Sequence, residues 1–489
     1  MPAVDPGANL AATLPVWALA GGSVTAYSRA TDRFRMAAGL EPLDAVPDPG
    51  RIAAAFASER LFRENGAAPD VFAPLSGFFT TADGWIRTHA NYPHHRTRLL
   101  AALGLPSGTS REEFTKHVAA LSASDIEDRA HEHGAIAVRV RTEHEWAASP
   151  QGRAAAAGPL VAIEPREDRR TGGGSFPDVS RSAADTTNPR RPAGSGDEMS
   201  SHGAQNLGGG DITAGGSSPG PGANRRSQAT LETWFAPTSL QPLRGVRVVD
   251  MTRVIAGPVA TRALALLGAE VVRIDPPGLP EIEWQYRDTC QGKRTTLLDI
   301  RTEWPLFRDL LENADVLISG YRPGALLRAG VDAGQIDPGI VYGRVCAWGE
   351  HGPWGDRRGF DSIVQAASGI SLIEGAQGDS RSEASVGALP AQALDHASGY
   401  LLAAGVLDAL VARGHDGIGR DVRVALARTA SWLLAAPGRT PEHPPAALPD
   451  ARYAVTHDGI TTAGPALPAY PDYPFPAPKY GANPAAWTA

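Results

Sequence analysis

The stretch Val246–Asp275 decides the fold, and it reads VRVVDMTRVIAGPVATRALALLGAEVVRID. Its first five residues and residues 270–274 are rich in valine and isoleucine, which is typical of buried strands. Between them, Pro258 suits the first position of a helix, where its missing N–H leaves no hydrogen bond unmade, and we expect that helix to run to Leu267. Strand, helix and strand in this order predict a βαβ unit of the dinucleotide-binding type, although the GxGxxG phosphate loop is absent.

The same alternation continues to residue 426. Gly414 is expected to cap the last helix of this series, because glycine adopts the left-handed conformation at little cost. Alternating strands and helices predict an α/β fold with a Rossmann-like open, mostly parallel sheet covered by helices. The further strands are predicted at 316–319, 340–345 and 420–426, and the further helices at 306–313, 361–368 and 396–413.

The chain has 489 residues, of which 42% are apolar and 20% charged, and its net charge is -7. These values predict a soluble globular protein of two or three domains and argue against nucleic acid as its main partner. No apolar run is long enough to span a bilayer, and residues 1–17 lack the pattern of a secretory signal, so we expect no membrane partner and a cytoplasmic location. Cys290 and Cys346 are then expected to be free buried thiols.

Composition changes sharply near residue 164. Residues 164–229 are mostly Gly, Ser, Pro, Asp and Arg and contain almost no large apolar side chains. Such a segment cannot bury enough surface to offset the entropy of ordering it, so we predict a disordered linker. This linker separates an N-terminal region, 1–163, from a C-terminal region, 230–489.

The N-terminal region has secondary structure of its own but no recognisable metal site. Its histidines occur as His94-His95 and as the pair His131 and His133, with neither zinc-type spacing nor an obvious further ligand. We therefore expect structural or solvated histidines and no metal. Strands are predicted at 84–89 and 136–140, and helices at 96–103 and 119–133.

Four short motifs follow one another in the C-terminal region. They are GKR at 292–294, YRPGA at 321–325, GPWGDRRGFD at 352–361 and QALDH at 392–396. Over residues 242–426 this series resembles the family III CoA-transferases, which include formyl-CoA transferase and carnitine CoA-transferase. The resemblance implies a Rossmann-like large domain with a smaller α+β domain, and a CoA-transferase activity (EC 2.8.3.-) that moves CoA from an acyl-CoA to a carboxylate. It also implies coenzyme A as substrate, no permanently bound cofactor, and a homodimer.

The N-terminal region resembles the smaller module of the same family. The likeness rests on DGWI at 83–86, LLAALG at 99–104 and GAIAVRVRT at 134–142. In the family this module follows the catalytic half, whereas here it precedes it. We therefore interpret the chain as a rearranged family member, with the small module first, then the linker, then the catalytic half at 230–489.

Asp395 stands directly before the predicted helix 396–413. A carboxylate at that place accepts hydrogen bonds from free N–H groups and interacts favourably with the helix dipole, so the pattern alone predicts a helix N-cap. The resemblance implies a further and compatible role, because Asp395 matches the nucleophilic aspartate of the family. That aspartate attacks the acyl-CoA thioester and later carries CoA as an aspartyl-CoA thioester.

Asp361 is the second candidate catalytic carboxylate. It begins a predicted helix, so it is either a cap or the ion-pair partner of Arg358, and the family also places an acidic residue here near the CoA site. Phe360 matches the position at which the related α-methylacyl-CoA racemases carry a histidine that moves the α-proton. Phenylalanine cannot exchange protons, which favours CoA transfer over racemisation.

The resemblance also implies a set of CoA-binding positions. Arginine suits phosphate because its forked donors match the oxygens of the anion. Arg253 and Ile255 replace a histidine and a glutamine of formyl-CoA transferase, so the acceptor pocket is expected to differ. The matching CoA positions are Arg273, Leu298, Arg301, Tyr321, Ala325, Arg328 and Arg358.

Two alternatives to a transferase stay open at this point. One is an acyl-CoA racemase or isomerase of the same fold, which Phe360 disfavours. The other is a non-catalytic CoA-binding homologue. It is kept open by the rearranged module order and by the lack of a clear match to the glycine-rich loop that helps to hold the oxyanion in the family.

Overall fold

The computed structural model describes residues 7–166, 240–331, 337–375 and 385–488. Apart from its first residues, the linker predicted at 164–229 lies outside the described residues. Regular structure continues to residue 165, just past the predicted boundary at 163. The linker and the domain boundaries stay predictions.

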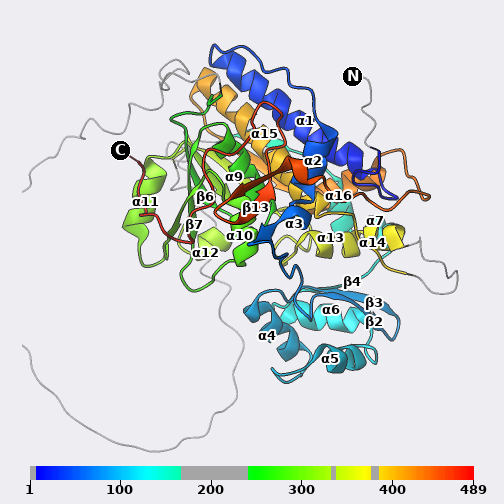
Figure 1. The fold of residues 1–489 in the computed structure, drawn as a ribbon. Helices are drawn as coiled ribbons and strands as arrows, with labels where there is room; N and C mark the ends of the chain where they lie inside the picture. The colour runs from blue at the N-terminus through cyan, green and yellow to red at the C-terminus, as the bar shows by residue number, and fades with distance from the viewer. Residues whose placement is uncertain (1–6, 167–239, 332–336, 376–384, 489) are drawn as a thin grey trace, which may run out of the picture. The chain divides into compact units, whose positions relative to one another are not determined.

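A seven-stranded sheet lies at the centre of the C-terminal region (Figure 1). Its strand order is β5-β11-β10-β9-β6-β7-β8. All neighbours are parallel except β5, an edge strand from the N-terminal region that pairs antiparallel with β11. This arrangement confirms the predicted α/β class. The strands are β5 Ala162–Pro165, β6 Arg247–Met251, β7 Glu270–Asp275, β8 Arg294–Leu297, β9 Val316–Ser319, β10 Val341–Cys346 and β11 Arg420–Ala425.

Neighbouring residues of the strands point into two different cores. Val248 belongs to the core that includes α9 (Ala256–Leu266) and α15 (Ala393–Asp416). Val249 belongs to the core that includes α11 (Trp304–Glu312). Because both faces of the sheet are covered, the central strands β6 and β9 bury successive residues on both faces, as expected for a parallel sheet.

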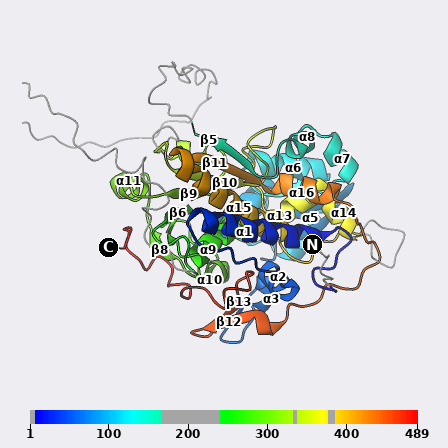
Figure 2. The ribbon, with the colours of Figure 1, turned by 90° about the horizontal axis from the view of Figure 1, so that it is seen from above.

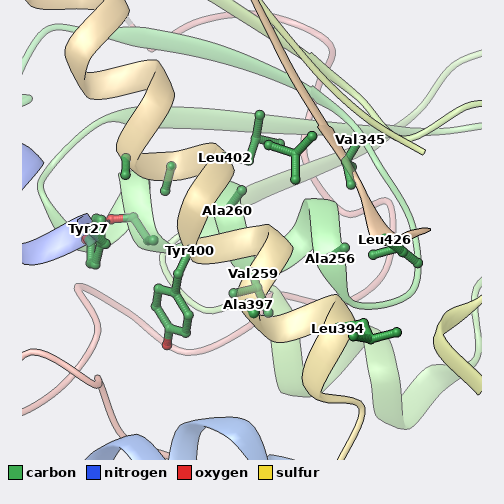
Figure 3. Packing of buried hydrophobic residues seen from close by; sticks show 14 of the residues in the cluster. Tyr27, Ala256, Val259, Ala260, Val345, Leu394, Ala397, Tyr400, Leu402 and Leu426 are labelled. Carbon is green, nitrogen blue, oxygen red and sulfur yellow. Dashed lines mark hydrogen bonds between the residues drawn. The ribbon is translucent and has the colours of Figure 1, made fainter. Parts of the chain in front are cut away.

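The long helix α15 packs against α9 and against α1 (Val16–Ala37), which runs beside it in both views (Figures 1 and 2). Figure 3 shows Tyr27 of α1 close to Tyr400 of α15, and their ring centroids are 5.7 Å apart. The helix continues past Gly414, so the predicted cap is wrong. The cap is Gly417, which has the left-handed φ of 74°.

A smaller α+β unit follows in the N-terminal region, with its own core around Phe79, Ile86 and Phe114. Its helix predicted at 119–133 begins only at Ala123, because the Ser122 hydroxyl caps it by accepting a hydrogen bond from a main-chain N–H in the first turn. The antiparallel sheet order is β2-β3-β4. The elements are β2 Gly77–Thr81, β3 Gly84–Thr88, β4 Ala137–Arg139, α4 Pro93–Ala102, α5 Arg111–Val118 and α6 Ala123–Glu132.

The N-terminal and C-terminal regions are joined through α13 (Asp361–Ser368), which contacts β3 and β4. The Arg141 N–H donates a hydrogen bond to the Ala366 carbonyl at 3.1 Å. The two cysteines are free as predicted, although Cys346 is only partly buried. No helix in the described part of the chain is long and apolar enough to cross a membrane.

The remaining elements are short and lie mainly at the edges of these layers. A third sheet has the strand order β1-β13-β12. The elements are α2 Pro49–Phe56, α3 Ser58–Leu61, α7 Glu143–Ala148, α8 Pro150–Ala156, α10 Glu283–Thr289, α12 Ala325–Arg328, α14 Ile370–Gly375, α16 Leu426–Ala435, η4 Ala451–Tyr453, β1 Arg63–Glu64, β12 Ala454–His457 and β13 Ile460–Ala463.

Candidate active site

The strand order of the large sheet reverses at β6. The chain moves outward from β6 through β7 and β8, then returns to the other side of β6 with β9, β10 and β11. In open α/β sheets, ligands bind at such a switch point, beyond the carboxyl ends of the strands. The turn that leaves β6 contains Val254 and Ile255, and both line a cavity there.

This cavity is lined by both regions of the chain. Its volume is about 30 Å³, which is room for roughly one or two water molecules. The C-terminal region contributes Asp395 from α15 and Phe360 beside α13, and the N-terminal region contributes Glu59 from α3 and His89 after β3. The small α+β unit therefore completes the cavity within one chain.

Asp395 is the third residue of α15 and not its cap. The helix begins at Ala393, and its N-cap position is held by Gln392 without a side-chain hydrogen bond. The N-cap prediction for Asp395 is therefore wrong. Instead, the Asp395 main-chain N–H donates a hydrogen bond to Oδ2 of Asp361 at 3.0 Å.

Asp361 is the first residue of α13, and its carboxylate is fully buried. Besides the Asp395 N–H, it accepts a hydrogen bond from the side chain of Gln365. Among the described residues it makes no ion pair with Arg358, so that expectation is wrong. The Asp361 carboxylate therefore accepts its hydrogen bonds from α13, which it begins, and from the start of α15.

Burial raises the pKa values of both carboxyls. The Asp361 pKa is raised to about 6 by burial, although the N–H groups of Asp395 and Leu394 and the side chain of Gln365 favour its charged form. The Asp395 pKa is raised well above its usual range, first by burial and then by the neighbouring Asp361 charge. The first negative charge of the pair therefore settles on Asp361, and Asp395 retains its proton.

Phe360 has a histidine stacked on its ring. The ring centroids of Phe360 and His89 lie 4.0 Å apart with an angle of 17° between the ring planes. His89 is buried, and burial together with the Arg87 charge lowers its pKa to about 3, so its imidazole is neutral. The sequence carried no signal for this contact, because His89 and Phe360 belong to different regions of the chain.

The turn after β6 is strained. Val254 has φ of 69°, a left-handed conformation that is rare and unfavourable for a β-branched residue. Its N–H donates to Oε2 of Glu281 at 3.0 Å, and the same oxygen accepts from Arg273 Nη2 at 3.0 Å. Glu281 thereby fixes the strained turn, whose residues Val254 and Ile255 line the cavity.

Arg273, one of the predicted CoA-binding residues, lies in this network. Its guanidinium is fully buried and donates to both carboxylate oxygens of Asp275, at 2.7 and 3.0 Å, as well as to Glu281. Two carboxylates thus already balance its charge. A direct phosphate contact from Arg273 stays a prediction.

The other predicted CoA positions lie in different settings. Leu298 is buried in the core beneath α11, whereas Arg301 and Arg328 are exposed. Arg301 pairs with Asp299 at 2.8 Å. Tyr321 and Ala325 follow β9 and are half-buried. The structure leaves the roles of these residues as predictions.

Arg358 belongs to a group of arginines that the sequence did not bring together. Burial and the neighbouring charges of Arg322 and Arg98 lower its pKa to about 10. Arg98 comes from α4 of the N-terminal region and Arg322 from the turn after β9. In the described chain no acidic side chain pairs with the Arg358 guanidinium. Asp356 is an acidic neighbour of Arg322. Clustered arginine charges are the arrangement expected where an anion binds.

The predicted histidine pairs form no metal site in the structure. The rings of His94 and His95 contact each other, with centroids 4.2 Å apart. Within the described residues, no three His, Cys, Asp or Glu side chains gather where they could hold a metal ion.

Comparison with known proteins gives the family. Residues 243–445 match the sequence profile of CoA-transferase family III. This segment belongs to CoA-transferase family III. The resemblance recognised in its sequence is thus confirmed, and Asp361 and Asp395 both lie inside the matched residues.

Several curated relatives of this family III segment carry names of CoA-transferases. The segment is 36% identical over 219 residues to an acetyl-coenzyme A transferase of Hypoxylon pulicicidum, covering 42% of this chain and 36% of that protein. It is 34% identical over 220 residues to a probable fatty acyl-CoA transferase of Mycobacterium tuberculosis, covering 41% and 54%. It is 32% identical over 200 residues to a formyl-CoA:oxalate CoA-transferase of Streptomyces coelicolor, covering 38% and 47%. The chain thus spans about half or less of the length of these relatives.

Solved structures are similar to part of this chain. A hypothetical protein of M. tuberculosis has 33% identity and a TM-score of 0.36, covering 40% of this chain and 57% of that one. A CAIB/BAIF family protein of Brucella suis has 26% identity and a TM-score of 0.35, covering 40% and 56%.

Proposed function

We propose that this protein is an acyl-CoA:carboxylate CoA-transferase in which Asp395 is the nucleophile. The observation that carries the proposal is the buried pair of Asp395 and Asp361. Asp395 lines the cavity at the switch point of the large sheet, and both residues lie in the segment that matches CoA-transferase family III. The named relatives act on acyl-CoA or formyl-CoA substrates, which supports the same class of substrate here.

The chemistry requires an ionised Asp395. The Asp395 proton first passes to water. The carboxylate then attacks the thioester carbonyl carbon, the C–S bond breaks, and CoA leaves as a thiolate. The mixed anhydride is then attacked by that thiolate at the Asp395 acyl carbon, which releases the first acid as a carboxylate and leaves an aspartyl-CoA thioester. The acceptor carboxylate repeats these two steps in reverse order, and Asp395 is regenerated. Each step exchanges groups of similar energy and loses no thioester to water.

Asp361 acts as a positioning residue in this scheme. Its hydrogen bond to the Asp395 N–H fixes the first turn of α15, from which the nucleophile projects. Its negative charge also makes the Asp395 carboxylate more basic, which makes that carboxylate a better nucleophile once it is ionised. A glycine-rich oxyanion loop is not assigned to any residues of this chain.

The arginine group supplies the place for the phosphates of CoA. The charges of Arg98, Arg322 and Arg358 gather at the join of the two regions, and phosphate oxygens match guanidinium donors well. Arg98 would make the N-terminal region a part of the CoA site. Leu298, Arg301, Tyr321, Ala325 and Arg328 remain the further CoA positions that the family resemblance implies.

A second candidate function, exchange of the α-proton of an acyl-CoA, has one observation in its favour. Phe360 cannot move a proton, but the neutral imidazole of His89 is stacked on it and lines the same cavity as Asp395. Exchange of an α-proton uses a base and an acid, and the pKa of His89, lowered to about 3, makes its neutral imidazole a weak base. CoA transfer stays the first candidate because the named relatives are transferases.

One experiment separates these functions. The protein is incubated with an acyl-CoA in deuterated water, and both the Asp395 peptide and the acyl-CoA are analysed by mass spectrometry. A transferase gains the mass of CoA less one water on Asp395, whereas a racemase introduces deuterium at the α-carbon. If CoA binds and neither change occurs, both candidates fail and the protein is a non-catalytic CoA-binding homologue.

We further propose that the protein works as a homodimer in the cytoplasm. The dimer rests on the family resemblance and the location on the composition of the chain. Light scattering at micromolar concentration tests the dimer, and a monomer with full transferase activity would overturn it. Cell fractionation tests the location, and recovery with membranes would overturn it.

A further inference from the structure

Five residues that line the Asp395 cavity carry buried polar atoms without hydrogen-bond partners in the described chain. Buried polar atoms are nearly always paired in proteins, so such a concentration marks a place where a partner is missing. Three of the five residues lie on the single helix α10. The atoms are His89 Nδ1, Trp284 Nε1, Gln285 Oε1, Asp288 Oδ1 and His396 Nδ1.

The part of the cavity lining that α10 contributes offers both hydrogen-bond donors and acceptors. The indole of Trp284 can only donate, whereas Gln285 Oε1 can only accept. Asp288 is held in place because its Oδ2 accepts from the Ser58 hydroxyl at 2.6 Å, which leaves Oδ1 for another partner. A hydroxyl group donates one hydrogen bond and accepts others, so it is the small group that satisfies this mixture best.

The charges around the cavity disfavour a second carboxylate. The described lining contains Glu59, Asp288 and Asp395 but no lysine or arginine. A ligand with an additional negative charge would lose its hydration and find no cation to replace it. An ammonium group would also lose hydration, and it could not accept a hydrogen bond from Trp284.

We infer that the acyl group held beside Asp395 carries a hydroxyl, so that the substrates are small hydroxy acids and their CoA thioesters. This inference rests on the proposed transferase function for its turnover, but not for binding of the free acid. The small volume of about 30 Å³ has room for the hydroxyl-bearing end of a short acyl group and excludes a bulky one. Trp284, Gln285 and Asp288 recognise the hydroxyl and determine specificity.

Four acids of matched length test the inference: 3-hydroxypropionate, propionate, β-alanine and malonate, each with acetyl-CoA as donor. We expect kcat/KM for 3-hydroxypropionate to exceed that for propionate by roughly ten-fold or more, because propionate leaves the buried polar atoms unpaired. Malonate should be the poorest acceptor. Equal rates for propionate and 3-hydroxypropionate, or a higher rate for β-alanine or malonate, would overturn the inference.

Two substitutions connect the preference with α10. Gln285→Met and Trp284→Phe put an apolar side chain in place of the original one and remove the polar atom, so each should lower the ratio of the two kcat/KM values toward one. Glu283→Gln on the same helix changes an exposed side chain outside the cavity and should leave the ratio unchanged. A ratio that stays high in both cavity variants would place the recognition elsewhere and overturn the assignment to α10.

Calorimetry with the free acids distinguishes failure of this inference from failure of the proposed function. Tighter binding of 3-hydroxypropionate than of propionate, without transfer to any acid, would support the hydroxyl site and refute the transferase. Transfer to all four acids without a preference would support the transferase and refute the hydroxyl site. No difference in binding together with no transfer would refute both.

Discussion

The main-chain N–H of Asp395 donates a hydrogen bond to Oδ2 of Asp361 at 3.0 Å, so the first turns of α15 and α13 are tied at the two carboxyl-bearing residues. The main-chain N–H of a residue remains when its side chain is substituted. The Asp395 carboxylate can therefore be changed while the hydrogen bond between the two helices remains.

Asp395→Asn should abolish transfer while the protein stays folded. Asparagine keeps the shape of the side chain and the main-chain N–H but cannot attack a thioester, so we expect a loss of roughly 10³-fold or more in kcat. Transfer kinetics and circular dichroism measure the two effects. Asp408→Asn, on the exposed side of the same helix, should retain activity. Near-normal transfer by Asp395→Asn would refute the nucleophile.

Stability should fall as pH rises past the pKa of Glu59. Burial raises that pKa from 4.5 to about 7, so its contribution to stability is complete below about pH 4.5 and is lost as pH rises through about 7. Glu59→Gln cannot ionise and should become more stable than the wild type at pH 8, by on the order of 1 kcal/mol or more. Urea unfolding between pH 5 and 8 measures this. Glu112→Gln, which is exposed on α5, should follow the wild-type curve, and parallel curves for Glu59→Gln would contradict the prediction.

Arg273→Met should destabilise the fold more than it affects CoA binding. The substitution removes the guanidinium that bonds to Asp275 and Glu281, and it leaves buried carboxylates without that partner. Loss of one partner of a buried ion pair costs about 3–5 kcal/mol. Denaturant unfolding gives the value, and Arg301→Met, which breaks an exposed pair, should change it by less than about 1 kcal/mol. A stable Arg273→Met protein with weakened CoA binding would instead favour a direct phosphate role.

Arg98→Ala should weaken the use of acyl-CoA and spare substrates that lack the nucleotide. Removing one member of the arginine group proposed to bind phosphate should lower kcat/KM for acyl-CoA by about ten-fold or more, and less at high salt. Acyl-pantetheine, which carries no ADP moiety, should react with both proteins equally. Arg129→Ala, exposed on α6, is the matched control. Equal losses with both substrates would show that Arg98 acts on structure and not on phosphate.

Gly369→Ala should destabilise the join between the two regions. Gly369 has φ of 95°, and an added Cβ would lie 2.4 Å from the Glu143 nitrogen, so both strain and collision arise. We expect a loss of more than about 2 kcal/mol in the free energy of unfolding. Gly108→Ala, where a Cβ meets no atom within 4 Å, should change it by less than about 0.5 kcal/mol. An unchanged melting temperature in Gly369→Ala would contradict the prediction, because the backbone near Glu143 would then have moved to make room for the Cβ at little cost.

Most of the large sheet could be predicted from the sequence, because its strands are short apolar runs separated by helical patterns. The edge strand β8 was missed, since Arg294–Leu297 has two threonines and only one large apolar residue. The helix α1 was also missed, because Gly21 and Gly22 interrupt its pattern. In contrast, the sequence does contain a clear start signal for α2, although this helix was not predicted. Asp48 caps α2 directly before a proline.

The candidate site was predictable only where it follows a local motif. Asp361 and Asp395 lie in recognisable motifs, but the start of α15 was misplaced because none of the usual Ser, Thr, Asp or Asn caps precedes Ala393. Arg98 and His89 carried no signal. Their partners, Arg358 and Phe360, lie in the other region of the chain, and packing alone brings them together.

The pairing of β5 with β11 has a consequence for how this chain reaches its native state. Glu164 and Asp421 are register partners, and about half of the chain separates them. Their loop must close before the edge of the large sheet is covered, and contacts so distant in sequence slow folding. During synthesis β5 emerges long before its partner exists, and until it docks, β11 presents a bare edge to other chains. Aggregation during refolding should therefore depend strongly on protein concentration.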